Sequence, residues 1–251
     1  MSTTDCMITE NCKATNLERV RYFPRQLITA EDMRQEQDYF REKMRRHNRF
    51  LHGWGVVCGC QVEALEDAQH RWLVRVHGGY VVNPRGDEIL IPECIANKPV
   101  TFDLAGDWRQ AYDPCPEPST CSPARGTSAD TKKTVFLAVC YSECEVRPVR
   151  THPAGCGCDE AACEYSRIRE SFELVRLDEL PVSHVQADIM DKNLPLWNRP
   201  KKEKAEPLPG CPDPSGGDCV VLASITLPAR RTVQITQQDI SYDNRRVLAR
   251  P

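Results

Sequence analysis

The feature that most constrains the fold is a change of hydrophobic period at Gly53, where a helical pattern gives way to alternating apolar residues. Upstream of it, Thr29 is a preferred N-cap residue, and acidic side chains follow in the first turn, where the helix dipole favours negative charge. We therefore expect a helix from Ala30 to about Leu51, with Gly53 as its C-terminal stop.

One face of this predicted helix has mixed polarity. The residues that recur at helical spacing on it are Met33, Gln37, Phe40, Met44, His47 and Leu51. A stripe that is one third polar favours a helix packed on another chain or on a partly wet surface. The C-terminal half is also basic, through Arg41, Lys43, Arg45, Arg46 and Arg49. We interpret these cations as a solvated face well placed for the helix dipole, with a binding patch as the alternative.

Downstream of Gly53 the pattern predicts strands. Val56, Cys58, Cys60 and Val62 would lie on one face of a strand, and Trp72, Val74 and Val76 on one face of the next. Turn-forming residues at 83–86 separate 80–82 from 88–91, as in a hairpin. Further strands are expected at 134–141, 165–176 and 219–227, and a short helix at 181–189. The predicted class is α+β, mainly β, with one long N-terminal helix followed by small antiparallel sheets and long Pro- and Cys-rich insertions.

The 251 residues allow one large domain or two small ones, and we expect two packed units. Stretches rich in Pro, Ser, Gly and Asp mark the boundaries. The expected order is an N-terminal arm at 1–28, a helix plus small β-domain at 29–104, a loop or linker at 105–133, and a second β-unit at 134–251. This last unit would contain a Cys-rich loop and an insertion at 191–218.

Charge and hydropathy exclude several partners. A formal net charge of −3 gives no global field that would attract nucleic acid or an anionic membrane, so nucleic acid is not an expected partner. No stretch reaches the roughly 18 apolar residues of a membrane helix, and the N-terminus lacks the pattern of a signal peptide. We therefore expect synthesis in the bacterial cytoplasm.

The chain has 14 cysteines, several of them close together. In a reducing compartment such spacing favours metal binding over disulfides. The preferred ligands of a structural zinc ion, which takes four N or S ligands, are Cys144, Cys156, Cys158 and Cys163. Disulfides and free thiols are the alternatives, and His152 is a possible substitute ligand.

Other cysteines lie outside this cluster. Cys115 with Cys121, and Cys211 with Cys219, could form a second metal site or two short-loop disulfides. Cys58 and Cys60 are interpreted as buried core thiols.

Catalytic motifs are absent from the sequence. There is no GxSxG, phosphate-binding P-loop or Rossmann glycine pattern, and His47 and His52 do not have the spacing of a helical zinc motif. We expect a protein that is not an enzyme.

Residues 21–33, 36–40, 47–53 and 55–59, with the turn segment 82–89, resemble a family of phage tail and baseplate-associated proteins. The family is also found in gene clusters of contractile injection systems. The resemblance is strongest over 21–92 and continues at 156–159, 163–166 and 219–223. Cys60 stands where family members often have leucine, which argues against a metal or disulfide role for Cys58 and Cys60.

The resemblance implies a structural component of a phage-tail-like particle, at the baseplate or the spike and fibre attachment region. Its expected partners are other tail and baseplate proteins, and we expect it to be oligomeric and incorporated into the particle after synthesis. The predicted interaction helix uses Met33, Phe40, Met44, Arg45, Arg46, Arg49 and Leu51. The alternatives are a zinc-stabilised nucleic-acid-binding module and a thiol- or metal-dependent enzyme.

Overall fold

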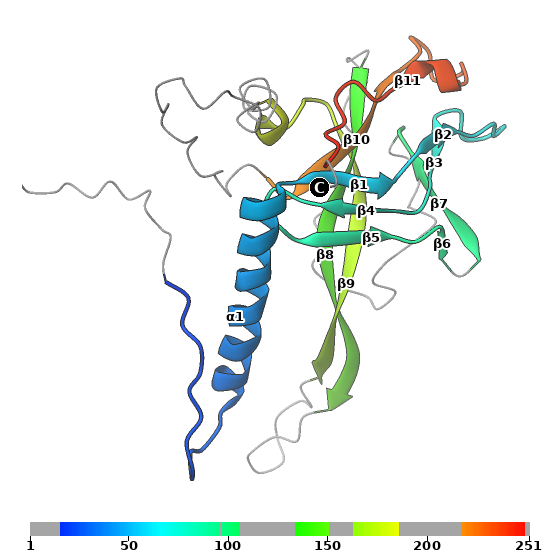
Figure 1. The fold of residues 1–251 in the computed structure, drawn as a ribbon. Helices are drawn as coiled ribbons and strands as arrows, with labels where there is room; N and C mark the ends of the chain where they lie inside the picture. Colours follow the sequence, from blue (N-terminus) through cyan, green and yellow to red (C-terminus); the bar gives the residue numbers. More distant parts are fainter. Residues whose placement is uncertain (1–15, 96, 106–133, 151–162, 186–216, 249–251) are drawn as a thin grey trace, which may run out of the picture.

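The computed structural model describes residues 16–95, 97–105, 134–150, 163–185 and 217–248 (Figure 1). Within these ranges the protein is mainly β, with small antiparallel sheets and one long helix. This confirms the predicted fold class in outline, although the helix begins 30 residues into the chain rather than at its start. The predicted linker at 105–133 and most of the insertion at 191–218 lie outside the described residues.

Helix α1 spans Ala30–His47 and begins where the sequence predicted. The Thr29 side chain accepts a hydrogen bond from the Asp32 backbone N–H, and the Asp32 carboxylate accepts one from the Thr29 backbone N–H. This reciprocal capping box satisfies two backbone donors that the first turn leaves unpaired. A π-helical turn, η1 (Asn48–His52), continues α1 and ends at Gly53, where φ is 82°.

The strands form three antiparallel sheets. The first has the order β1-β4-β5, the second β2-β3-β7-β6, and the third β11-β10-β8-β9. The strand bounds are β1 Gly55–Gly59, β2 Val62–Ala64, β3 Leu73–Val76, β4 Gly79–Val82, β5 Glu88–Ile91, β6 Cys94–Ile95, β7 Lys98–Asp103, β8 Thr134–Arg150, β9 Cys163–Leu177, β10 Cys219–Thr226 and β11 Ile240–Ser241. The predicted 80–91 hairpin is confirmed as β4–β5, whereas β6, β7 and β11 were not predicted.

The strand expected through Val56 and Val62 is interrupted. A bulge shifts the register between Val56 and Cys58, and Cys60 has a φ of 56°, so β1 ends before β2 begins in another sheet. Cys60 is buried as predicted, and burial raises the pKa of its thiol to about 12. Cys58 is exposed, so its assignment as a core thiol was wrong. The bulge in β1 breaks the strict alternation of side chains on which that assignment depended.

Strands β8 and β9 form a hairpin much longer than the sequence indicated. Its register runs from Phe136 opposite Leu177 to Arg150 opposite Cys163. The base of the hairpin is buried in the sheet, while the distal half carries exposed apolar residues, namely Val149, Tyr165 and Ile168. The distal half extends beside α1 as an arm (Figure 1).

A single large cluster of buried side chains joins residues from both predicted β-units, from Trp54 to Leu104 and from Val135 to Ile235. The chain end closes over this cluster. Arg245 donates hydrogen bonds to the carbonyl oxygens of Leu222 and Cys60, and Arg246 donates one to the carbonyl oxygen of Trp54. These two guanidinium groups therefore bind the backbone of other elements.

Candidate interaction surface

Helix α1 buries none of its residues against the rest of the chain. We define the α1 stripe as Met33, Gln37, Phe40, Met44 and His47, which lie on one face of the helix and are all exposed. The exposed fractions are 50% for Met33, 60% for Phe40 and 54% for Met44. Exposed apolar residues that gather on one face mark interaction sites, whereas scattered ones need no explanation.

A second face of α1 is attached to the β-sheets by polar contacts. Arg41 forms an ion pair with Glu143 on β8, and its guanidinium lies 6.0 Å from the centre of the Tyr141 ring. One turn further on, Arg45 binds Asp87 at 2.5 Å and Glu42 at 2.6 Å. Burial disfavours the charged Arg45, but the hydrogen bonds to Asp87 and Glu42 outweigh it, so the pKa of Arg45 is raised.

The C-terminal end of the helix rests on the turn between β4 and β5. The Asn48 side chain is buried and donates to the Gly86 carbonyl oxygen at 2.9 Å and to Glu88 at 3.1 Å. Gly86 has a φ of 94°, and a Cβ there would lie 2.2 Å from the Arg45 carbonyl oxygen. Glycine is therefore required at this position both by the backbone conformation and by the close approach of α1.

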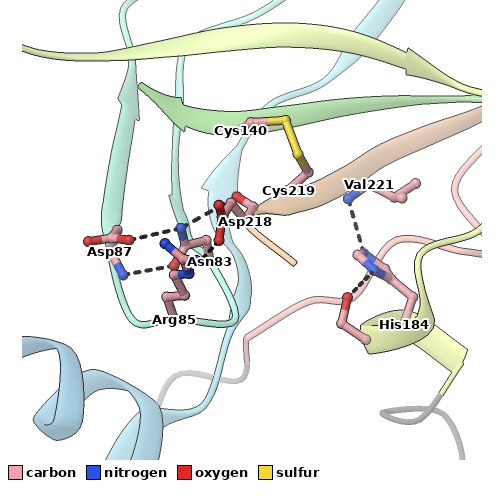
Figure 2. The surroundings of a disulfide bond; sticks show 9 residues. Asn83, Arg85, Asp87, Cys140, His184, Asp218, Cys219 and Val221 are labelled. Carbon is pink, nitrogen blue, oxygen red and sulfur yellow. Dashed lines mark hydrogen bonds and ion pairs between the residues drawn. A yellow bond between two sulfur atoms is a disulfide. The ribbon is translucent and has the colours of Figure 1, made fainter. Parts of the chain in front are cut away.

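The turn itself is stabilised by its own side chains and by the start of β10. The Asn83 side chain accepts from the Asp87 backbone N–H at 2.8 Å, and its amide donates to Asp87 at 3.2 Å. Arg85 forms an ion pair with Asp218 at 2.6 Å (Figure 2). The helix end, the β4–β5 turn and the start of β10 are thus held together by hydrogen bonds and ion pairs.

A third face of α1 lies beside the segment that leads into it. An open hollow between them is lined by Leu17, Glu18, Glu31, Gln35, Asp38, Tyr39 and Glu42. The same leading segment presents exposed apolar side chains just before the helix, namely Tyr22, Phe23, Leu27 and Ile28. The leading segment and the arm thus flank α1 on two sides and leave the α1 stripe open.

The basic residues predicted for an interaction helix have other contacts. Arg45 is partly buried in its pairs with Asp87 and Glu42, and Arg49 donates to the Arg85 carbonyl oxygen at 3.2 Å. Arg46 also has a partner within the chain. Guanidinium groups that are already engaged with carboxylates and carbonyls are less available for phosphate. The apolar members Met33, Phe40 and Met44 are the exposed part of the predicted set, and Leu51 is exposed on η1.

Two of the cysteines form a disulfide that the sequence did not predict. Cys140 on β8 and Cys219 on β10 are bonded, with their Cα atoms 4.1 Å apart (Figure 2). The antiparallel register places these two residues directly opposite each other. The suggested pairing of Cys219 with Cys211 is therefore wrong. The pairing of β8 with β10 brings Cys140, 79 residues away in sequence, next to Cys219.

The proposed zinc ligands are only partly described. Cys144 is buried on β8 and is itself disulfide-bonded, and a sulfur in that state is not the thiolate that zinc needs. Cys163 begins β9, while Cys156 and Cys158, like Cys115, Cys121, Cys211 and His152, lie outside the described residues. Among the residues that are described, no group of three or more His, Cys, Asp or Glu side chains could hold a metal ion. The zinc site stays a prediction, and it would require reduction of Cys144.

His184 has a structural environment. Its Nε2 accepts a hydrogen bond from the Val221 backbone N–H at 3.0 Å (Figure 2). Its ring also packs edge-on against Trp54, with the ring centres 4.7 Å apart. Burial, with a smaller effect of the Arg246 charge, lowers the pKa of His184 to about 4. The neutral ring therefore serves as a hydrogen-bond acceptor that fixes the 182–185 helical turn against β10.

The described part of the chain thus defines a mainly β protein with one open helical face. No helix in it is long and apolar enough to span a membrane. No protein-family model matches the chain, and no curated protein matches it.

Two solved structures are similar at low level. One is the TssK–TssF–TssG baseplate subcomplex of the type VI secretion system, with a TM-score of 0.36 and 10% identity. The other is the crystal structure of TssK, with a TM-score of 0.37 and 11% identity. Both alignments cover 90% of this chain, but they cover only 59% and 40% of the matched chains. A likeness this weak supports no conclusion about function.

Proposed function

We propose that the protein is a structural, non-catalytic subunit of a phage-tail-like contractile particle, located at the baseplate or the spike and fibre attachment region. The observation that carries the proposal is the α1 stripe, a helix face with three exposed large apolar side chains that the chain's own fold leaves uncovered. Other tail and baseplate proteins are its proposed partners.

Helix stability gives a physical reason for a partner. An isolated helix of 18 residues is only marginally stable in water, because most helical stability comes from packing of an amphipathic face. Here α1 is attached through Arg41, Arg45 and Asn48, and its apolar face contributes nothing to the core. Docking of that face on another protein would supply the missing packing.

The segments that resemble phage tail and baseplate proteins also gather at this place. Residues 21–33 and 36–40 form the lead and the first half of α1, while residues 47–53 and 82–89 form its C-terminal end and the turn beneath it. Several of the resembling segments therefore build α1 and its attachment, while 55–59 form β1 and 219–223 lie in β10.

The test is to tag the protein in its host, sediment large assemblies, and identify the co-purifying proteins by mass spectrometry. Sheath, tube and baseplate proteins should accompany the wild type and the control Leu90→Glu, which changes an equally exposed apolar residue on β5. Phe40→Glu should move to the soluble pool. The proposal is refuted if the wild type is found only in a soluble pool without such proteins.

A further inference from the structure

A pair of histidines lies where α1 passes into the π-helical turn η1. His47 is the last residue of α1, His52 is the last residue of η1, and both are exposed. Their Nε2 atoms are 3.2 Å apart, and their ring centres are 5.1 Å apart. The two rings thus meet through the same nitrogen on an accessible surface.

The π-helical turn brings the two rings together. With about 3.6 residues per turn, side chains three or four residues apart share a face of an α-helix, and side chains five apart do not. In η1 the Gly53 backbone N–H instead donates to the Asn48 carbonyl oxygen at 2.9 Å, five residues back. This wider turn places His52 beside His47, although their spacing in the sequence differs from that of a helical zinc motif. Single π-helical turns within α-helices frequently occur at functional sites.

The distance between the two nitrogens fits two ligands of one metal ion. Zinc binds histidine nitrogen at about 2.0–2.1 Å with tetrahedral angles, so two such nitrogens lie about 3.3 Å apart. The Nε2–Nε2 distance of 3.2 Å matches this separation. Two rings in line along the N–N direction, as in a straight hydrogen bond, would have their centres further apart than 5.1 Å. The rings are therefore inclined to each other, as two ligands that converge on one ion are.

The protonation of the pair also leaves a position for an ion. At this distance only one of the two Nε2 atoms can carry a proton, so the other presents a lone pair. A metal ion takes the place of that shared proton, and both neutral rings then carry their proton on Nδ1. A hydrogen bond between the rings is the competing account, and it predicts no response to metal.

The basic residues of this helix end are engaged elsewhere. The Lys43 Nζ lies 3.5 Å from the Tyr39 hydroxyl, one turn further from the histidine pair. Arg49 lies over the Phe50 ring and donates to the Arg85 carbonyl oxygen. The negative end of the helix dipole, in contrast, favours a cation at the C-terminal end of a helix.

We propose that His47 and His52 bind one divalent transition-metal ion of the zinc, nickel or copper type through their Nε2 atoms. Imidazole nitrogen suits these ions, whereas magnesium and calcium take oxygen ligands. Among the described residues no group of three His, Cys, Asp or Glu side chains forms a metal site, so water completes the coordination of this two-ligand ion. The inference goes beyond the proposed function and does not depend on it.

The bound ion has a structural consequence. It joins the end of α1 to the end of η1, the turn that contains Asn48. Because the Asn48 side chain attaches the helix to the β4–β5 turn, the ion stabilises this attachment.

The first test is an NMR titration of the full chain with zinc chloride, with carbon-13 in the histidine rings. Exposed thiols such as Cys58 and Cys94 are alkylated beforehand, so that they do not bind zinc. The chain has six histidines, and the variants His47→Gln and His52→Gln assign the signals of the pair. These two signals should shift together and saturate at one equivalent of zinc. Signals of the pair that stay unchanged in a several-fold excess of zinc would overturn the proposal.

The second test is thermal unfolding of the alkylated proteins with and without zinc. An ion that binds only the folded chain raises the Tm, so zinc should raise it in the wild type. The rise should be lost in His47→Gln and in His52→Gln, and it should persist in the control His77→Gln, whose ring nitrogens already contact Glu63 and Glu93. An equal rise in all three variants would mean that zinc binds elsewhere and would overturn the proposal. Circular dichroism without zinc checks that each variant folds.

Discussion

Strand β10 and helix α1 each carry large apolar side chains, but the protein uses them in opposite ways. In β10 the six residues between its two ends are all buried, whereas in α1 none is buried. The strand lies between β8 and β11 in its sheet, and the helix is joined to the body by Arg41, Arg45 and Asn48. The difference teaches that apolar residues in β10 stabilise the fold, and that those in α1 are available for a partner.

The largest expected effect comes from the buried strand. Ile225 on β10 is fully buried, so Ile225→Ala should lower the free energy of unfolding by about 2–5 kcal/mol through lost burial and a cavity. Denaturant unfolding at constant m-value measures the change. A loss below ~1 kcal/mol would contradict the claim that the buried residues of β10 stabilise the fold.

The next prediction concerns the disulfide that joins β10 to β8. Replacement of both Cys140 and Cys219 by alanine removes a bond between residues 79 apart and should cost about 2–4 kcal/mol, because the unfolded chain gains freedom. Thermal unfolding of the double variant and of the wild type, both without reductant, measures the loss, because reductant would also break the disulfide of Cys144. Equal stability of the two proteins would show that the Cys140–Cys219 bond does not form in solution.

Acid should weaken the contact of the 182–185 turn with β10. Because the folded pKa of His184 is about 4 and the unfolded value is about 6.5, the unfolded chain binds a proton first, and stability falls as pH drops from 6.5 toward 4. His184 alone should then account for a loss of about 2 kcal/mol between pH 7.5 and pH 5. In His184→Gln this part of the pH slope should disappear, as denaturant titrations at both pH values would reveal.

The smallest effect on stability belongs to the helix. Phe40→Ala should change the free energy of unfolding of the free chain by less than ~0.5 kcal/mol, since an exposed side chain loses little on truncation. Unfolding must be measured at concentrations where the chain is monomeric. If Phe40→Ala lowered the free energy of unfolding as much as Ile225→Ala, α1 would have to pack on its own chain. The difference between α1 and β10 would then not exist.

Local signals in the sequence predicted local structure well. The Thr29 cap, the period of α1 and the turn residues 83–86 each act within a few residues, and the structure confirms all three. The exposed Met33, Phe40 and Met44 also match the mixed polarity of the predicted face. Signals of this kind depend on neighbours in the chain, so they are readable without the fold.

Features that depend on distant residues were missed. The Cys140–Cys219 bond follows from a strand register across 79 residues, and the Arg45–Asp87 pair forms only because the β4–β5 turn meets the end of α1. Cys58 became exposed through a bulge that no composition rule predicts. Strands were predicted at 134–141 and 165–176, but their extension and pairing into one long arm are tertiary properties.

The most direct test of the account is photo-crosslinking from α1 inside the host. A photo-reactive phenylalanine analogue replaces Phe40 in one strain and, as the matched control, Leu90 in another, and the sedimented assemblies are irradiated. The account predicts that position 40 crosslinks to protein in the particle fraction, and that position 90 does so much less. An equally incorporated protein whose position 40 yields no crosslink would contradict the claim that α1 is the docking face.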